Sequence, residues 1–302
     1  MEGLEFSSLS FLGGTFGVSV SETTALRAYP SQTSFGPLPF TEPRAVMVSN
    51  TDTPKSSAHL EGLAGWMLLI DYICSMKYQI ADDVIAFSTE RDEELPFYVV
   101  QPHQVHGCVI REVTDPMTTR EQLEGVDALI TNVPGVAISV RTADCIPVLL
   151  YDPVHKAIAA VHDGWRGTVQ RLSQKVIAEM GRRYGTRAAD LKAIIGPGIG
   201  PESFQVGQEV VDAFAEAGFP MEQILKDCGP KAPSAENPMA GGLHINLWKA
   251  NRWLLEEAGV QSANIQVAGI CTYRNNDRFY SARREGTKCG RIINCIKLLE
   301  KG

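Results

Sequence analysis

Residues 126–161 read VDALITNVPGVAISVRTADCIPVLLYDPVHKAIAAV, and the rest of the fold is best understood outward from this stretch. It contains four short apolar runs that predict strands. They are Val126–Thr131, Val136–Arg141, Ile146–Tyr151 and Ala157–Val161. Turn-forming residues separate them, as in Asn132-Val133-Pro134-Gly135 and Asp152-Pro153. The connections are too short for the helical crossovers of a βαβ unit, so the sheet is not a simple parallel one.

Helices and further strands flank this stretch. The clearest helix is Gly167–Tyr184, whose apolar residues form one stripe and which stops at Gly185. The other predicted strands are Phe97–Gln101, Cys108–Val113, Leu191–Ile195, Ile265–Ala268 and Ile292–Leu298, and the other helices are Gly207–Ala217 and Asn246–Ala258. We therefore predict the α+β class, as a mixed-sheet α/β sandwich in a single domain.

The first third of the chain is less regular. Residues 1–95 form a divergent N-terminal part, and residues 96–302 form the core that carries the motifs discussed below. The N-terminal part is rich in Ser, Thr and Pro up to Lys55, with a strand expected at Arg44–Ser49. His59–Met76 has the apolar spacing of a helix. We expect both parts to belong to one domain.

Composition restricts the classes of function. The chain has 302 residues, of which 44% are hydrophobic and 21% charged, and its net charge is -7. This is typical of a globular protein without a broad basic surface for nucleic acid. No apolar window approaches the ~20 residues of a membrane span, and the first basic residue, Arg27, comes too late for a secretory signal. The odd number of cysteines, seven, argues against a disulfide framework and favours a reducing, cytoplasmic location.

Three potential metal ligands stand where the pattern predicts strand ends. His106 lies in a turn between two strands, Cys145 opens a strand, and His162 follows a strand and precedes the best helix. Two His and one Cys are a sufficient protein shell for a zinc ion with an open fourth position. Such a position allows a metal to activate water or polarise an oxygen.

Several motifs occur in a fixed order around these residues. Gln104-Val105-His106-Gly107, Thr142-Ala143-Asp144-Cys145-Ile146-Pro147-Val148 and His162-Asp163-Gly164-Trp165-Arg166-Gly167 are followed by the stretches 195–201, 204–210, 271–273, 279–286 and 290–291. Together they resemble the YfiH family of laccase-domain proteins, which is also described as multifunctional purine nucleoside phosphorylases. The likeness extends from Gln101 to Arg291.

The resemblance implies a function and a ligand set. It implies that His106, Cys145 and His162 bind zinc and take part in catalysis. It implies phosphorolysis of adenosine, inosine or guanosine to the free base and ribose 1-phosphate, with adenosine deamination at the same site. The expected partners are therefore a small-molecule nucleoside and phosphate, not nucleic acid or a membrane, for a protein that is a monomer or homodimer.

The chain departs from the family in two places. Asp163 stands where the family usually has Ala, and a carboxylate there can tune His162 or contact the metal. The family opens with a Thr-Arg-x-Gly-Gly-Val-Ser-like stretch whose Arg lies near the active site. Here only Phe16-Gly17-Val18-Ser19 is similar, and no Arg precedes Arg27. If that Arg holds phosphate or substrate, we expect a weakened or altered activity.

Other polar residues of the motifs are candidates for supporting roles. Asp144 and Asp163 can transfer protons or orient the ligands. Arg166, Arg141 and Arg284 can bind phosphate or substrate, because a planar guanidinium suits an oxyanion; they can equally form structural ion pairs. The Gly196-Pro197-Gly198-Ile199-Gly200-Pro201 turn is interpreted as structural, since its prolines remove donors that a phosphate loop needs.

Two other functions stay open. Copper-dependent oxidation of phenols is one, because two His and one Cys also form a blue-copper ligand set. The chain has only six His, however, too few for the usual trinuclear centre of a multicopper oxidase. The other is binding or editing of peptidoglycan precursors, to which family members have been linked.

Overall fold

The computed structural model describes residues 10–11, 14–15, 76–230 and 241–300. The chain divides into two units, Met1–Thr53 and Pro54–Gly302. In the first, β1 (Ser10–Phe11) and β2 (Gly14–Thr15) form an antiparallel pair. The strand expected at Arg44–Ser49, the motif Phe16–Ser19 and residues 59–75 of the expected helix lie outside the described residues.

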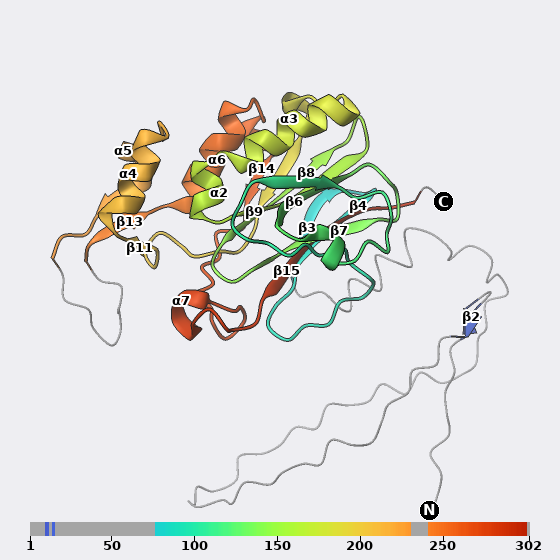
Figure 1. Cartoon of the computed structure of the whole chain (residues 1–302), viewed down its shortest axis with the longest axis horizontal. Coiled ribbons are helices and arrows are strands. Elements are labelled where there is room, and N and C mark those ends of the chain that lie inside the picture. Colours follow the sequence, from blue (N-terminus) through green and yellow to red (C-terminus); the bar gives the residue numbers. More distant parts are fainter. Residues whose placement is uncertain (1–9, 12–13, 16–75, 231–240, 301–302) are drawn as a thin grey trace, which may run out of the picture. The chain divides into compact units, whose positions relative to one another are not determined.

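A six-stranded mixed sheet is the centre of the second unit (Figure 1). Its order is β14-β10-β8-β9-β6-β5. The outer pairs β14/β10 and β6/β5 are parallel, and the inner pairs are antiparallel. The bounds are β5 Val109–Glu112, β6 Val126–Thr131, β8 Ile146–Asp152, β9 Ala157–Asp163, β10 Lys192–Ile195 and β14 Ile265–Val267.

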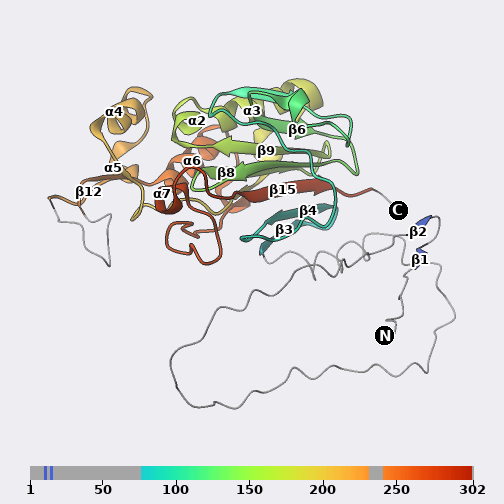
Figure 2. The same cartoon turned by 60° about the horizontal axis from the view of Figure 1, so that its bottom comes forward.

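Helices pack on one face of this sheet. Figure 2 shows α2 and α3 on the side of β8 and β9 opposite to β15. A cluster of buried side chains, including Val148, Ala159 and Val176, fills the space between sheet and helices. The helices on this face are α2 Trp165–Val169, α3 Leu172–Tyr184 and α6 Leu247–Glu257. The other helices are α4 Gln208–Glu216, α5 Met221–Ile224 and α7 Ala282–Glu285, and α7 lies apart from the rest (Figure 1).

A four-stranded antiparallel sheet covers the other face (Figure 2). Its order is β3-β4-β15-β7, with bounds β3 Met76–Ala81, β4 Val84–Ser88, β7 Ala137–Thr142 and β15 Ile292–Leu298. Apolar residues of both sheets, among them Leu149, Ile158 and Ile296, form the core between them. A three-stranded sheet of β11 Gln205–Val206, β13 Leu243–Ile245 and β12 Leu225–Asp227 completes the unit. The predicted fold class is confirmed.

Polar side chains tie β15 to its neighbours. The amide of Asn294, fully buried on β15, accepts a hydrogen bond from Ser88 Oγ at 2.6 Å and donates one to Thr142 Oγ1 at 2.9 Å. The Ser88 hydroxyl also lies 2.8 Å from the Tyr78 hydroxyl. A buried polar group costs little when it is hydrogen-bonded in this way. The network therefore fixes β3, β4, β15 and β7 in register.

The structure corrects several predicted elements. The predicted helix Gly167–Tyr184 is two helices, α2 and α3, because Arg171 between them adopts φ 59°. The predicted strand Phe97–Gln101 is reduced to a single bridge between Val100 and Ile138. Met76, the expected end of a helix, begins β3 instead. Since β4 pairs with β15, the last residues of the predicted N-terminal part are built into the core.

None of the helices in the described ranges has the length and apolar character that crossing a bilayer requires.

We expect Leu150→Ala to destabilise the protein by about 2–5 kcal/mol, because Leu150 is fully buried in β8 and its loss leaves a cavity. The free energy of unfolding from denaturant titration measures this change. Val154→Ala, at a side chain that is 61% exposed in the turn after β8, is the control and should change stability by less than about 0.5 kcal/mol. Equal effects of the two substitutions would contradict the assigned core.

Candidate metal centre

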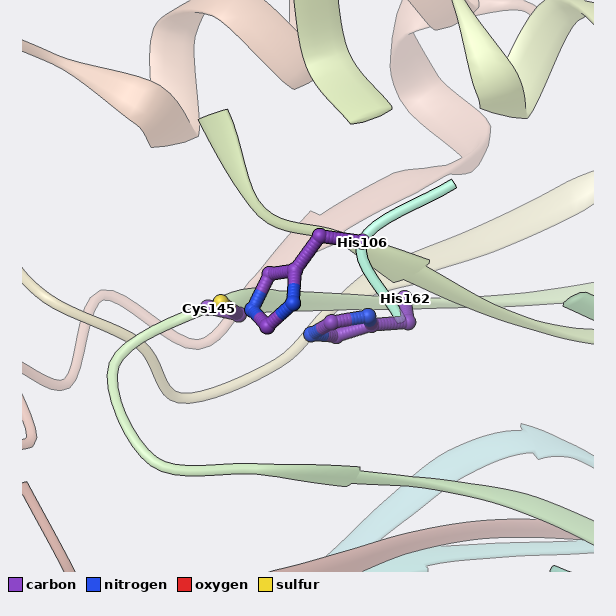
Figure 3. A group of neighbouring side chains, drawn as sticks. All are labelled: His106, Cys145 and His162. Atoms are coloured by element: carbon purple, nitrogen blue, oxygen red, sulfur yellow. The ribbon is translucent and has the colours of Figure 1, made fainter. Parts of the chain in front are cut away.

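Three segments of the six-stranded sheet bring His106, Cys145 and His162 together (Figure 3). His106 lies in the loop before β5, Cys145 directly precedes β8, and His162 lies in β9. The antiparallel register of β8 and β9 pairs Ile146 with Asp163, which places Cys145 beside the end of β9. The ligand atoms of the three side chains all lie within 4.8 Å of one another. This is the arrangement that a single metal ion requires.

The Asp127 carboxylate on β6 fixes two of these ligands. It is fully buried, and its Oδ1 accepts hydrogen bonds from His162 Nδ1 at 2.8 Å and from the His106 backbone N–H at 2.9 Å. Its Oδ2 accepts from the backbone N–H groups of Val105 and Gly107 at 3.2 and 2.8 Å. Because a carboxylate can only accept, His162 Nδ1 carries the hydrogen and Nε2 is left for a metal.

The environment of Cys145 also lowers the pKa of its thiol. Burial by itself raises the pKa of the Cys145 thiol, but the imidazoles of His162 and His106 outweigh burial and bring this pKa down to about 6. Burial disfavours the charged form of His162, yet the Cys145 sulfur and the Asp127 carboxylate raise the pKa of its imidazole. The thiolate is the form of cysteine that binds metals, so Cys145 is in its ligand form near neutral pH. A metal that binds here displaces the extra proton of His162.

Two motif residues shape the space around the ligands. Gly164 has no room for a side chain, because a Cβ there would lie 2.9 Å from Cys145 Sγ and 3.3 Å from His106 Cδ2. The Gln104 side chain donates to the backbone carbonyl of Arg141 and accepts from its N–H, both at 2.9 Å. Gln104 thereby ties the loop of His106 to the end of β7.

The three ligands line a pocket of about 680 Å³. Such a volume is within the usual range for small-molecule sites. Ile199 and Phe204 provide apolar wall. The polar and charged lining residues include His103, Gln104, Arg120, Arg141, Asp144, Arg283, Thr287 and Arg291.

The two aspartates beside the ligands have different surroundings. Asp144 lines the pocket, and its carboxylate accepts hydrogen bonds from Thr272 Oγ1 at 2.7 Å and from the Arg283 backbone N–H at 2.6 Å. Asp163 is fully buried and accepts a hydrogen bond from Ser173 Oγ on α3. Burial raises the pKa of Asp163 to about 7. It is not one of the residues whose ligand atoms converge.

The structure places one of the three predicted arginines in the pocket and two outside it. Arg141 lines the pocket, whereas Arg166 and Arg284 do not. The Arg166 guanidinium lies 4.4 Å from the centre of the Trp165 ring, and the Arg284 guanidinium donates to the Tyr273 carbonyl at 3.0 Å. His103, which also lines the pocket, pairs with Glu124.

Sequence reasoning missed Asp127, Arg120 and the pocket role of Arg291. Asp127 carried a signal, since it is a lone carboxylate inside the apolar run Val126–Thr131. A buried charge of this kind requires partners, and here they are the ligand loop and His162. Arg120 carried no such signal, because it lies in an irregular segment far from the motifs.

A comparison with protein families matches residues 75–299 to the family described as multi-copper polyphenol oxidoreductase laccase. The chain belongs to this family. The match covers the three ligands, Asp127 and every strand of the two larger sheets. It begins at the residue before β3, so the family's fold includes the β3/β4 hairpin.

Two curated proteins are similar to this chain over most of their length. A protein of Bacteroides thetaiotaomicron named purine nucleoside phosphorylase is 43% identical over 202 residues, covering 66% of this chain and 72% of its own length. A protein of an unknown prokaryotic organism named adenosine deaminase RL5 is 38% identical over 234 residues, covering 76% of this chain and 85% of its own.

A solved structure shows the same fold. The hypothetical protein YfiH of Bacillus licheniformis superposes with a TM-score of 0.63 and 27% sequence identity, over 71% of this chain and 92% of its own. The predicted family resemblance is therefore confirmed.

We expect Asp127→Asn to lower the affinity for a divalent metal about 10–100-fold, because the amide replaces one acceptor oxygen by a donor that faces N–H groups. Competition between the protein and a chelator, with Zn²⁺ as the probe, measures this affinity. Asp212→Asn, at an exposed residue of α4, is the matched control. Unchanged Zn²⁺ affinity in Asp127→Asn would show that the carboxylate does not organise the ligands.

Proposed function

We propose that the protein is a zinc-dependent purine nucleoside enzyme. Its reaction is phosphorolysis of adenosine, inosine or guanosine to the base and ribose 1-phosphate, with deamination of adenosine in the same pocket. The observation that carries the proposal is the convergence of His106, Cys145 and His162 in a pocket large enough for a nucleoside. The names of the related proteins support both activities.

The donor set fits zinc. Two imidazoles and one thiolate suit Zn²⁺ and leave its fourth tetrahedral position open. His162, with its hydrogen fixed on Nδ1 by Asp127, and Cys145, with its lowered thiol pKa, are both prepared to bind. When bound, the metal supplies a Lewis acid inside the pocket.

Copper-dependent phenol oxidation is the second candidate, and the description of the matching family favours it. The ligand set of one His₂Cys site is compatible with copper. In the described part of the chain, however, His106, Cys145 and His162 are the only group of three converging ligands. His155 pairs with Asp152, and both ring nitrogens of His244 face backbone carbonyls, so neither supplies a further copper site there.

Phosphorolysis requires the pocket to hold two reactants against each other. A phosphate oxygen attacks the anomeric carbon, the new C–O bond forms as the C1′–N9 bond breaks, and the base leaves with the bonding electrons and takes up a proton. Ile199 and Phe204 offer apolar surface to the purine. Holding the reactants in place removes much of the entropic barrier of a bimolecular step.

Deamination uses the same bound purine with water as the second reactant. Water adds at C6 of adenosine and ammonia leaves, which gives inosine. Asp144, the acidic side chain beside Cys145, is our candidate for moving a proton in either reaction. Its contacts with Thr272 and the Arg283 backbone hold its carboxylate at the pocket wall.

The proposal places the protein among enzymes of small metabolites rather than proteins that bind polymers. Its partners are a nucleoside and phosphate, and it acts as a monomer or homodimer. Cys108, Cys145, Cys228, Cys271 and Cys289 are free thiols, which supports a reducing, cytoplasmic setting.

We expect the zinc-loaded protein to release hypoxanthine from inosine only when phosphate is present, and Cys145→Ala to lose at least 100-fold of this activity together with its zinc. Chromatography of the bases and metal analysis of the purified protein measure the two effects. Cys228→Ala is the matched control, because Cys228 does not line the pocket.

The alternative functions predict different results in these experiments. Equal rates for wild type and Cys145→Ala would exclude the metal centre as the reaction site. A blue protein that oxidises phenols and leaves inosine intact would favour the copper function. Consumption of a muramyl precursor without nucleoside turnover would favour peptidoglycan editing.

A further inference from the structure

The pocket is strongly basic in an otherwise acidic chain. Four arginines line it, Arg120, Arg141, Arg283 and Arg291, whereas Asp144 is the one acidic side chain among the described lining residues. Both oxygens of Asp144 accept hydrogen bonds from other groups, Thr272 and the Arg283 backbone. The net charge of the chain is -7, so this concentration of positive charge is local. This local excess of positive charge favours the binding of an anion in the pocket.

Arg141 shows the excess of positive charge in the pocket most clearly. Its side chain is half-buried, and its Nε is buried without a hydrogen-bond partner among the described residues. Burial, and then repulsion by Arg120 and Arg291, lower the pKa of its guanidinium. A guanidinium nevertheless stays charged, so the cost of holding it there is offset only when an acceptor binds.

The two neighbouring arginines have no compensating carboxylate in the part of the chain that the structure describes. Within residues 76–230 and 241–300, neither Arg120 nor Arg291 forms an ion pair with an acidic side chain. The Arg291 guanidinium donates to the Gly290 and Thr287 carbonyls, both at 2.9 Å. These neutral acceptors hold the group in position without cancelling its charge.

The backbone of Arg141 is fixed to the metal centre. Gln104 pairs with both its N–H and its carbonyl, and Gln104 lies two residues before His106. Arg141 itself precedes Cys145 by four residues, across the short connection from β7 to β8. The arginines and the metal ligands are thus parts of one preorganised pocket.

From this geometry we infer that Arg120, Arg141 and Arg291 form a binding site for inorganic phosphate in the pocket of the metal centre. Guanidinium groups match the oxygens of a phosphate dianion bidentately, and several of them are needed to balance its charge. That the bound anion is the reacting phosphate of phosphorolysis rests on the proposed function.

Isothermal titration calorimetry of the zinc-loaded protein with inorganic phosphate, at constant ionic strength, tests the site. We expect saturable binding by the wild type and at least tenfold weaker binding in Arg141→Gln and in Arg120→Gln. Arg120 is exposed and makes no side-chain hydrogen bond to the described residues, so its variant keeps the test valid if Arg141→Gln fails to fold. Arg187→Gln, at a residue outside the pocket that is 75% exposed, is the matched control and should bind like the wild type.

Kinetics separate this site from the proposed function. If phosphorolysis occurs, the KM for phosphate should rise at least tenfold in both variants while the KM for inosine stays within twofold. Phosphate-dependent cleavage with an unchanged phosphate KM in both variants would overturn the site and leave the function standing. Arginine-dependent phosphate binding without nucleoside cleavage would support the site and remove the function.

A second ligand distinguishes free phosphate from the phosphate of a nucleotide. The same calorimetry with inosine 5′-monophosphate should show weaker binding than the summed binding free energies of inosine and phosphate predict. Saturation by the nucleotide with no saturable binding of inorganic phosphate would overturn the proposal, since the arginines would then hold a nucleotide.

Discussion

The Asp127 carboxylate organises the site more than any other group. It lies inside the core on β6, where an unpaired charge would be prohibitive, and it is tolerated because four donors meet it. Three of these donors are successive backbone N–H groups of the loop that carries His106, and the fourth is the ring of His162. This one carboxylate therefore fixes the conformation of an irregular loop and the orientation of an imidazole.

Two residues of the site have an unusual backbone conformation. His106 has φ 63° and Asp144 has φ 88°, in a region that side-chain-bearing residues rarely adopt. Each such residue costs on the order of 1–3 kcal/mol, which surrounding contacts must offset. For His106 the contacts come from Asp127, and for Asp144 from Thr272, the Arg283 N–H and the Ile199 N–H. Turns on either side of the pocket thus hold the ligands in place.

Local patterns predicted much of the fold, and their failures have physical causes. The runs Val126–Thr131 and Ile292–Leu298 were predicted with their observed ends, because both are mainly apolar and each follows a glycine within two residues. Periodicity could not reveal that β7 leaves its sequence neighbours for the second sheet, nor that Arg171 interrupts a helix. For the site, motifs identified His106, Cys145 and His162, which the structure brings together. The roles of Asp127, Arg120 and Arg291 were missed because they depend on neighbours distant in sequence, although Asp127 stands out as a lone carboxylate in an apolar run.

The position of β15 has a consequence for how the protein is made. This strand lies between β4 and β7, although some 200 residues separate Asn294 from its partner Ser88. Neither β4 nor β7 has its main neighbour until the ribosome has released residues 292–298. Long-range pairing of this kind is slow, because a large loop must close before contacts compensate. The nascent chain therefore carries two exposed strand edges until residues 292–298 have emerged, and the wall of the pocket that includes Arg141 cannot be completed before then.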